Sequence, residues 1–177
     1  MAKKVAGLIV GLALFIGLPG FVHQVTNNKI SIGYNQGYMP DQPIPFSHEL
    51  HAGQNKIACQ YCHTGTEDSR HASVPSLNIC MNCHLTVKAG SPYIQQITEA
   101  YSNGESIPWK KVHLLPDHVK FNHQAHVKAG KDCQTCHGPV EQMEVVYQHS
   151  DLSMGWCVNC HRQPENNASV NCGTCHY

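Results

Sequence analysis

The chain has 177 residues, with 12 Lys and Arg against 12 Asp and Glu, and 41% of its residues are apolar. This length predicts one or two small domains, and the apolar fraction is low for a protein that folds around a large core of its own. The balanced charge, without an arginine-rich run, argues against a nucleic-acid partner.

The first predicted element is an N-terminal membrane anchor. Lys3 and Lys4 precede an uncharged run from Val5 to Val22, which as a helix would be about 27 Å long, close to the hydrocarbon thickness of a bilayer. The run is long for a cleaved signal peptide, and no A-x-A site follows it. We therefore predict a single transmembrane helix over residues 1–22, in contact with membrane lipid. The lysines place the N-terminus in the cytoplasm and the rest of the chain on the periplasmic side of the inner membrane.

An extended linker is predicted next, over residues 23–45. Gly, Asn and Pro are frequent there, and no helical period is visible.

A five-residue pattern, Cys-x-x-Cys-His, then occurs five times and contains every cysteine of the chain. The copies, numbered motifs 1 to 5 in chain order, contain the cysteines Cys59, Cys62, Cys80, Cys83, Cys133, Cys136, Cys157, Cys160, Cys172 and Cys175. Their histidines are His63, His84, His137, His161 and His176. Cys-x-x-Cys-His is the attachment motif of c-type haem. We therefore predict five covalently bound haem c groups, with these histidines as proximal iron ligands.

Other cysteine chemistries fit this pattern less well. Zinc sites and redox-active thiols also use Cys-x-x-Cys pairs, but neither requires a histidine after the second cysteine. All five pairs have one here, although the chain contains only 14 His. A disulfide framework would not place ten cysteines so regularly.

The motifs belong to two related blocks. Phe46–His51 and Phe121–His126 both read F-x-H-x-x-H, and each leads after a short spacer to a C-Q-x-C-H motif. A further motif follows in each block, and the second block adds motif 5. We interpret this repeat as a duplication, with a dihaem block over residues 46–90 and a trihaem block over residues 121–177.

A helical connector is predicted between the blocks, over residues 91–120. Its helix runs from Ser91, a good N-cap, to Tyr101, and Asn103-Gly104 can end it. The apolar face of this helix consists of Ile94, Ile97 and Tyr101. We expect the helix to pack between the two blocks, and we expect little or no β structure anywhere in the chain.

Each electron-transfer haem needs a second, distal axial ligand. Histidine gives a lower potential and methionine a higher one. The leading candidates are the histidines of the two F-x-H-x-x-H segments, because an i, i+3 pair can reach two different irons. These candidates are His48, His51, His123 and His126, followed by His113.

Two methionines are alternative ligands. Met143 and Met154 lie in the linker between motifs 3 and 4, which is longer than its counterpart in the first block. Met143 is preferred, because Met154 is only three residues before motif 4. Core packing is the competing interpretation of a buried methionine. We interpret His118, beside Asp117, as a surface or propionate-contacting residue.

The F-x-H-x-x-H pairs and the close spacing of the motifs resemble the class III multihaem cytochromes. The stretches IPFSHELHAG, VHLLPDHVKFNHQAHV and MGWCVNCHR resemble, more specifically, the membrane-anchored pentahaem cytochrome c subunit of alternative complex III. The resemblance covers about residues 43–163. It implies mostly bis-His haems with some His/Met ligation.

The resemblance also implies a role and partners. The chain would relay electrons from a quinol-oxidising complex to a periplasmic cytochrome c, a high-potential iron–sulfur protein or a terminal oxidase. Its partners would be polytopic membrane subunits that handle quinol and a large iron–sulfur subunit. The chain itself would be a non-catalytic electron-transfer subunit.

The predicted fold is therefore a mostly α-helical and irregular multihaem cytochrome c with one N-terminal transmembrane helix. Two other functions stay open. A small membrane-anchored quinol dehydrogenase feeding a periplasmic reductase is disfavoured by the long separation between Val22 and Cys59. A haem enzyme such as a nitrite reductase needs one open iron, which the surplus of histidines argues against.

Overall fold

The computed structural model describes residues 35–177. The predicted anchor over residues 1–22 and the first part of the predicted linker lie outside the described residues. Residues 35–177 form one compact unit. None of the helices between residues 35 and 177 has both the length and the apolar character that crossing a bilayer requires.

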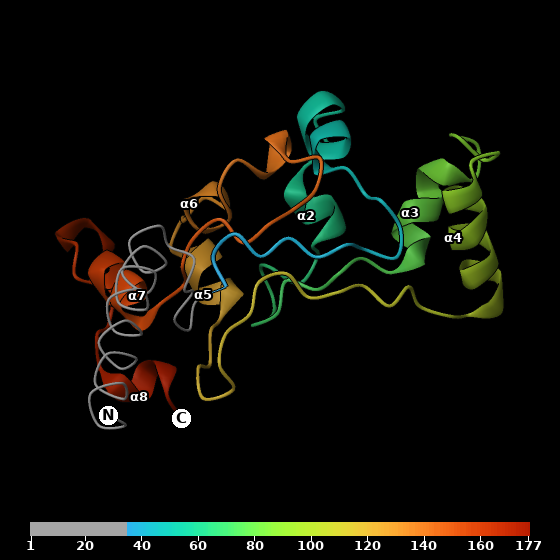
Figure 1. Ribbon diagram of the computed structural model, residues 1–177. Helices are drawn as coiled ribbons and strands as arrows, with labels where there is room; N and C mark the ends of the chain where they lie inside the picture. Colours follow the sequence, from blue (N-terminus) through green and yellow to red (C-terminus); the bar gives the residue numbers. More distant parts are fainter. Residues whose placement is uncertain (1–34) are drawn as a thin grey trace, which may run out of the picture. The chain divides into compact units, whose positions relative to one another are not determined.

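This unit is helical and irregular, and residues 35–177 contain no β-strand, as the sequence predicts. In chain order its helical segments are the π-helix η1 (Glu49–Gln54), α2 (Cys59–Cys62), α3 (Leu77–His84), α4 (Pro92–Asn103), α5 (His123–Lys128), α6 (Gln134–His137), the 3₁₀-helix η2 (Val140–Gln142), α7 (Met154–His161), the 3₁₀-helix η3 (Pro164–Asn166) and α8 (Cys172–Cys175). Motifs 1 to 5 coincide with α2, α3, α6, α7 and α8, which Figure 1 shows as short helices joined by long irregular segments.

The longest helix within residues 35–177, α4, forms where the sequence predicts one. Ser91 is its N-cap, and Gly104 ends it in the left-handed conformation, with φ 70°, that glycine adopts readily. Its buried residues are Ile94, Ile97 and Ala100. The expectation for Tyr101 was wrong, because this side chain is exposed. Ala100 continues the i, i+3 row from Ile97, so the buried face is turned away from Tyr101.

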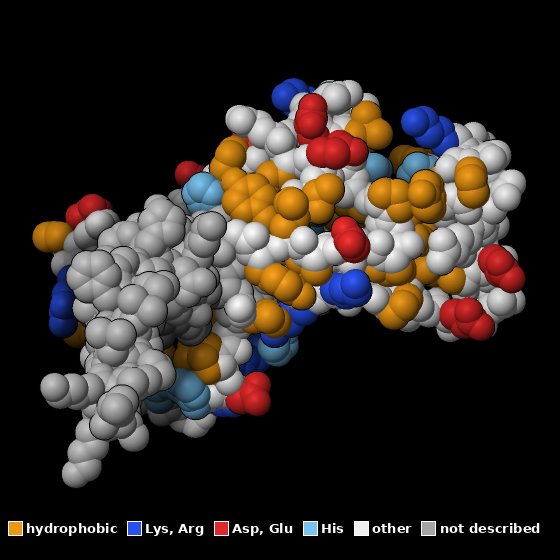
Figure 2. All heavy atoms as spheres, viewed as in Figure 1, with side chains coloured by type: hydrophobic (Ala, Val, Ile, Leu, Met, Phe, Trp, Pro, Cys, Tyr) orange, Lys and Arg blue, Asp and Glu red, His pale blue; other side chains and the backbone are white. Residues whose placement is uncertain are grey.

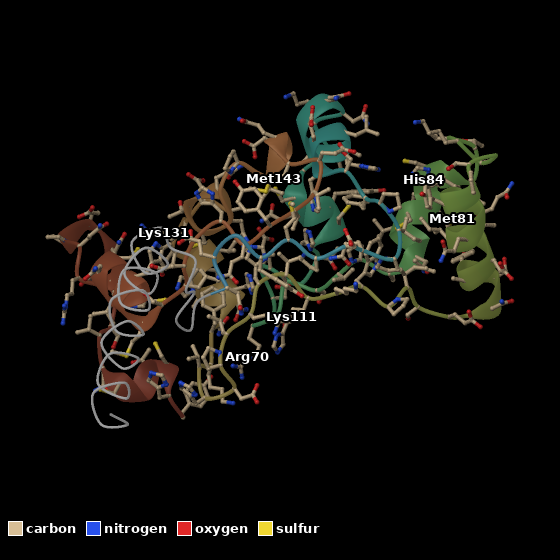
Figure 3. The ribbon with its side chains drawn as sticks, viewed as in Figure 1. Arg70, Met81, His84, Lys111, Lys131 and Met143 are labelled. Carbon is tan, nitrogen blue, oxygen red and sulfur yellow. The ribbon has the colours of Figure 1, made fainter. Side chains whose placement is uncertain are left out.

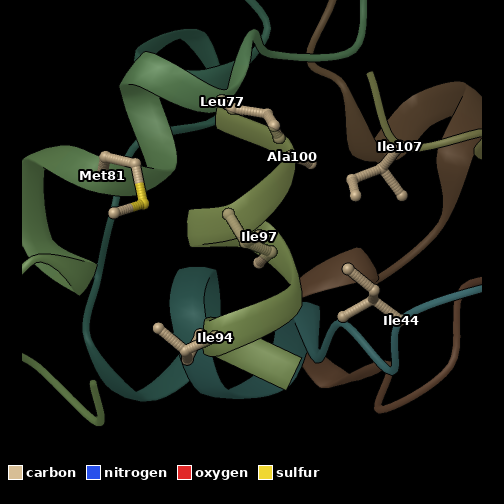
Figure 4. Packing of buried hydrophobic residues seen from close by; sticks show 7 residues of the cluster. All are labelled: Ile44, Leu77, Met81, Ile94, Ile97, Ala100 and Ile107. Carbon is tan, nitrogen blue, oxygen red and sulfur yellow. The ribbon is translucent and has the colours of Figure 1, made fainter. Parts of the chain in front are cut away.

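One apolar cluster forms around α4, and Figure 4 shows its packing. The cluster consists of Ile44, Leu77, Met81, Ile94, Ile97, Ala100 and Ile107. All of these residues precede the second block, so α4 packs on α3 of the first block instead of between the two blocks. Within residues 35–177, Val112 and Met143 are the buried hydrophobic residues outside the cluster. Little apolar surface is therefore packed inside the protein, and Figure 2 shows many apolar side chains on the visible face.

The two blocks meet where η1 packs on η2. A Cβ added to Gly53 of η1 would overlap the backbone carbonyl oxygen of Glu141, so no other residue fits there without movement. Glu49 N donates a hydrogen bond to the carbonyl oxygen of Met143 at 3.0 Å. The Ser47 hydroxyl also hydrogen-bonds the Glu144 carboxylate. This contact holds the segment around η1 against the loop that follows motif 3.

Candidate haem sites

A phenylalanine orients the two histidines of each F-x-H-x-x-H segment. The ring of Phe46 meets that of His48 edge-on, with 4.8 Å between centroids, and stacks on that of His51 at 4.3 Å. In the second block Phe121 meets His123 edge-on at 4.8 Å. It also stacks on the ring of His126 at 4.5 Å. The duplication therefore extends from the sequence to the side-chain geometry.

The residue before each histidine pair supports the helical turn that carries it. The Ser47 hydroxyl accepts a hydrogen bond from Leu50 N at 3.0 Å, and the Asn122 side chain accepts one from Ala125 N at 3.3 Å. The carbonyl oxygens of the same two residues each accept Nδ1–H of a predicted ligand at 2.8 Å. These pairs are Ser47 with His51, and Asn122 with His126.

Four of the five proximal histidines are oriented in the same way, by a backbone carbonyl that accepts from Nδ1. The pairs are His63 with Ser73 at 2.7 Å, His84 with Val87 at 2.9 Å, His161 with Ser169 at 2.7 Å and His176 with His118 at 2.9 Å. A carbonyl oxygen can only accept, so the ring proton is on Nδ1 and Nε2 keeps the lone pair that a metal needs.

The structure brings three predicted distal histidines next to proximal ones. The ring centroids are 6.1 Å apart for His51 and His84, 5.9 Å for His126 and His161, and 6.3 Å for His123 and His137. Two imidazoles on opposite sides of one metal have their ligating nitrogens about 4 Å apart, at about 2 Å per bond, and hence their ring centres roughly 6 Å apart. The three pairs have the separation that a shared iron requires.

His48 lies near the proximal histidine of motif 1. Burial lowers its pKa to about 4, and the charges of His63 and His51 contribute to the shift. In the second block the corresponding residue, His123, faces the proximal histidine of motif 3. The repeat therefore matches His48 with His63.

His118 faces motif 5, which the sequence interpretation did not anticipate. Its ring centroid is 5.6 Å from that of His176, with the planes 24° apart. Motif 5 has no F-x-H-x-x-H segment of its own. The carbonyl oxygen of His118 accepts from Nδ1 of His176, so His118 lies on the side of that ring opposite to Nε2 and is not its distal partner.

His113 occupies a different position from the other predicted distal ligands. Its Nε2 is 3.1 Å from Nδ1 of His137, and the two rings meet edge-on at 4.4 Å. Burial, followed by the charge of His123, lowers the pKa of His113. Burial, followed by the charge of His113, lowers the pKa of His137 to about 4. Both rings are therefore neutral near pH 7.

The two candidate methionines differ in exposure. Met143 is 5% exposed and lies where the loop after η2 meets η1 (Figure 3). Met154, at the start of α7, is 69% exposed. The burial of Met143 agrees with either core packing or ligation, and its role as a ligand stays a prediction.

Two features of the described residues fit a bound haem. Arg70 Nε is buried without a hydrogen-bond partner among residues 35–177, and a haem propionate would pair with it. Large apolar side chains beside the motifs are exposed, and these are Tyr61, Leu85, Met154 and Tyr177. An apolar macrocycle held at each motif would cover them.

The comparison with known proteins agrees with this geometry. Residues 119–177 match the family model described as cytochrome c7 and related cytochrome c. The chain thus carries a cytochrome c7-like multihaem domain. Its cofactor is covalently bound haem c, and its role is electron transfer. The chain is also similar to the menaquinone reductase, multiheme cytochrome c subunit, of Nitratidesulfovibrio vulgaris. The two are 28% identical over 161 residues, which cover 77% of each chain.

The motifs of this cytochrome do not follow one another in space as they do in the chain. Burial raises the pKa of the Cys62 thiol in motif 1. The nearby thiols of Cys80, Cys59 and Cys83 raise this pKa further. Cys80 and Cys83 belong to motif 2, so motif 2 adjoins motif 1. In motif 3, burial and then the nearby thiol of Cys59 raise the pKa of the Cys133 thiol before haem is attached. Motif 1 therefore adjoins motif 3 as well.

The remaining neighbours continue the row. Burial raises the pKa of Cys136 in motif 3, as do the charges of Cys160 and Cys157 in motif 4. Burial and then the charge of Cys175 in motif 5 raise the pKa of Cys157. The spatial order of the motifs is 2, 1, 3, 4, 5, and Figure 1 shows α2 between α3 and α6.

Proposed function

We propose that this cytochrome carries five haem c groups and is the electron-transfer subunit of a membrane complex that exchanges electrons with quinone, of the alternative complex III type. The observation that carries the proposal is the presence of paired histidines at four of the five haem positions. The proposed pairs are His48/His63, His51/His84, His123/His137 and His126/His161. A haem iron with two protein ligands exchanges single electrons and has no position for a substrate. Such a chain relays electrons and does not convert a substrate.

The row of motifs supports a linear relay. Each motif adjoins the next one in the order 2, 1, 3, 4, 5. Motifs 2 and 5 are the ends of this row. One end would receive electrons from the quinone-handling partner, and the other would meet the periplasmic partner.

The proposed location is the periplasmic face of the inner membrane, with residues 1–22 as the anchor and the N-terminus in the cytoplasm. The uncharged run after two lysines supports this topology. The proposed partners are polytopic quinol-handling subunits, a large iron–sulfur subunit and a periplasmic cytochrome c or oxidase. The similar subunit of a menaquinone reductase supports a complex that acts on quinone.

The name of that relative also favours a second candidate, in which electrons flow inward and reduce menaquinone. The two candidate functions differ in the direction of electron flow and share the same arrangement of haems. Purified complex mixed with a reduced quinol analogue, or with a reduced periplasmic cytochrome, distinguishes them by which donor reduces the haems rapidly.

The experiment that tests the proposal is purification from native membranes in mild detergent, followed by mass spectrometry of the co-purifying proteins. We expect polytopic subunits and a large iron–sulfur subunit, and a mass that corresponds to five haems on this chain. Recovery with only a soluble periplasmic reductase would contradict the proposal and favour a small quinol dehydrogenase. Rapid binding of carbon monoxide to more than one reduced haem would contradict the four histidine pairs and favour a haem enzyme.

A further inference from the structure

We propose that His113 is a positioning residue for the haem at motif 3, and not an iron ligand. Its Nε2 accepts the Nδ1–H of His137, in the place that a backbone carbonyl has at the other four motifs. The inference rests on the proposed ligation of the motif 3 haem by His137.

The hydrogen bond has only one direction that is compatible with haem binding. A bond between two neutral imidazole nitrogens needs one N–H and one lone pair. If His113 donated to Nδ1 of His137, the proton of His137 would be on Nε2, and no lone pair would be left for the iron. His137 must therefore donate from Nδ1, and Nε2 of His113 accepts.

The position of His113 also excludes it as the distal ligand of this haem. It contacts the Nδ1 edge of His137, whereas the iron binds at Nε2. A metal does not fit between two nitrogens 3.1 Å apart when each bond needs about 2 Å. His123, whose ring is parallel to that of His137 within 6° at 6.3 Å, has the separation that the distal position requires.

A difference between the two blocks explains why Nδ1 of His137 donates to a side chain and not to a backbone carbonyl. In the first block the carbonyl of Ser73, in the loop between motifs 1 and 2, accepts from His63. In the second block the corresponding loop makes another contact, in which the Ser150 hydroxyl donates to the carbonyl of Cys136 at 2.7 Å. The connector then supplies His113 as the acceptor.

The backbone beside His113 is well anchored. Leu114 N donates to Oε1 of Gln148 at 3.4 Å, and Gln148 is fully buried. Gln148 is held in turn by its own amide, which donates to the carbonyl of Ser150 at 3.1 Å. The imidazole of His113 is therefore presented from a fixed position, as a positioning role requires.

The expected consequence is a lower potential for the haem at motif 3. An acceptor at Nδ1 raises the basicity of a ligating imidazole, and an imidazole nitrogen is a stronger acceptor than an amide oxygen. A more basic ligand stabilises ferric iron over ferrous iron. Loss of this acceptor raises the midpoint potential.

The test uses the full-length, haem-loaded protein and three variants. His113→Phe keeps a ring without an acceptor, and His113→Gln supplies an amide oxygen. The control Tyr101→Phe removes the hydroxyl of an exposed ring on α4, which packs on α3 of the first block. We expect every haem to stay low-spin by electron paramagnetic resonance in all three. In His113→Phe one midpoint potential rises, in His113→Gln the rise is smaller, and in Tyr101→Phe the potentials are unchanged.

Two results would overturn the inference. A high-spin haem in both His113 variants would make His113 a ligand, and unchanged potentials would reduce its role to packing. If His113→Phe loses one haem by mass, the hydrogen bond is measured directly in the reduced wild-type protein, labelled with ¹⁵N-histidine. A through-bond coupling between the two ring nitrogens supports the inference, and its absence contradicts it. A missing haem at motif 3 of the wild-type protein would instead refute the proposed function.

Discussion

The position of one proton decides whether each histidine of this protein can ligate iron. At motifs 1, 2, 4 and 5 a backbone carbonyl holds the proton on Nδ1, and the same device is used at His51, His123 and His126. A carbonyl cannot donate a hydrogen bond, so these rings are set in the iron-binding tautomer before haem arrives. The backbone thus sets the tautomer that the proposed ligands need.

His126 gives the clearest test of the ligand pairs. We expect His126→Ala to leave one haem without its distal ligand, because the ring of His126 is 5.9 Å from that of His161. That haem becomes high-spin and binds carbon monoxide when reduced, and visible and paramagnetic resonance spectra measure both changes. The control is His71→Ala, which removes an exposed histidine. A fully low-spin His126→Ala protein would contradict the pair.

The methionines give the complementary prediction. Because motifs 1 to 4 have a proposed histidine pair each, we expect Met143→Leu to leave the near-infrared spectrum and all midpoint potentials unchanged. Because Met143 is buried and leucine has a similar volume, the free energy of unfolding falls by less than about 1.5 kcal/mol. Met154→Leu, at an exposed position, changes neither the spectrum and midpoint potentials nor the free energy of unfolding. A lost methionine–iron band in either variant would restore that methionine to the ligand set.

Most of the candidate residues are marked by short sequence patterns, for a physical reason. The cysteines and proximal histidines lie within five consecutive residues, and the F-x-H-x-x-H histidines are three residues apart. The contacts of His118 with His176 and of His113 with His137 are not predicted, because these residues lie far apart along the chain. Only the folded structure shows which nitrogen of His137 meets His113.

At the scale of elements, local signals predict α4 well and the packing between blocks poorly. The helix begins after Ser91, whose side chain makes no capping hydrogen bond, and stops at Gly104, and both boundary residues are visible in the local sequence. The contact of η1 with η2 joins residues of different blocks, and no local pattern marks it. The place of α4 on the first block follows from Ile44, Leu77 and Ile107, which reach it from other segments.

Gly53 tests the contact between the blocks. We expect Gly53→Ala to lower the free energy of unfolding by about 1–3 kcal/mol, because the added methyl group would overlap the Glu141 carbonyl and force η1 away from η2. Chemical denaturation of the haem-loaded protein measures the change. The control is Gly90→Ala, where a Cβ meets nothing within 4 Å. Equal stability of the two variants would show that the blocks do not depend on this contact.

At the scale of the whole molecule, the spatial order of the motifs is the feature that the sequence does not contain. The repeat predicts two blocks, but it does not predict that motif 1 adjoins both motif 2 and motif 3. Ser69 and Arg70, which follow motif 1, also accept hydrogen bonds from Gln124 and His123 of α5. The duplication therefore produced one continuous row through a new contact between the blocks.

The small apolar core makes the haems structural elements of the molecule. Within residues 35–177 the buried apolar cluster lies around α3 and α4, and motifs 1, 3, 4 and 5 are outside it. The hydrophobic free energy that orders these segments must come largely from apolar contact with haem. We expect protein produced without haem attachment to lose its near-UV circular dichroism and to unfold without a cooperative transition.

The position of each motif in the row predicts how much its haem matters to stability. Replacing Cys59 and Cys62 by alanine removes the haem at motif 1, which has neighbours on both sides. The matched control replaces Cys172 and Cys175 at motif 5, the end of the row. We expect the motif 1 variant to have the lower melting temperature in calorimetry and a broader transition, because both blocks lose a shared contact. Equal losses in the two variants would mean that each haem stabilises only its own segment, and the row would then be a path for electrons without being a source of stability.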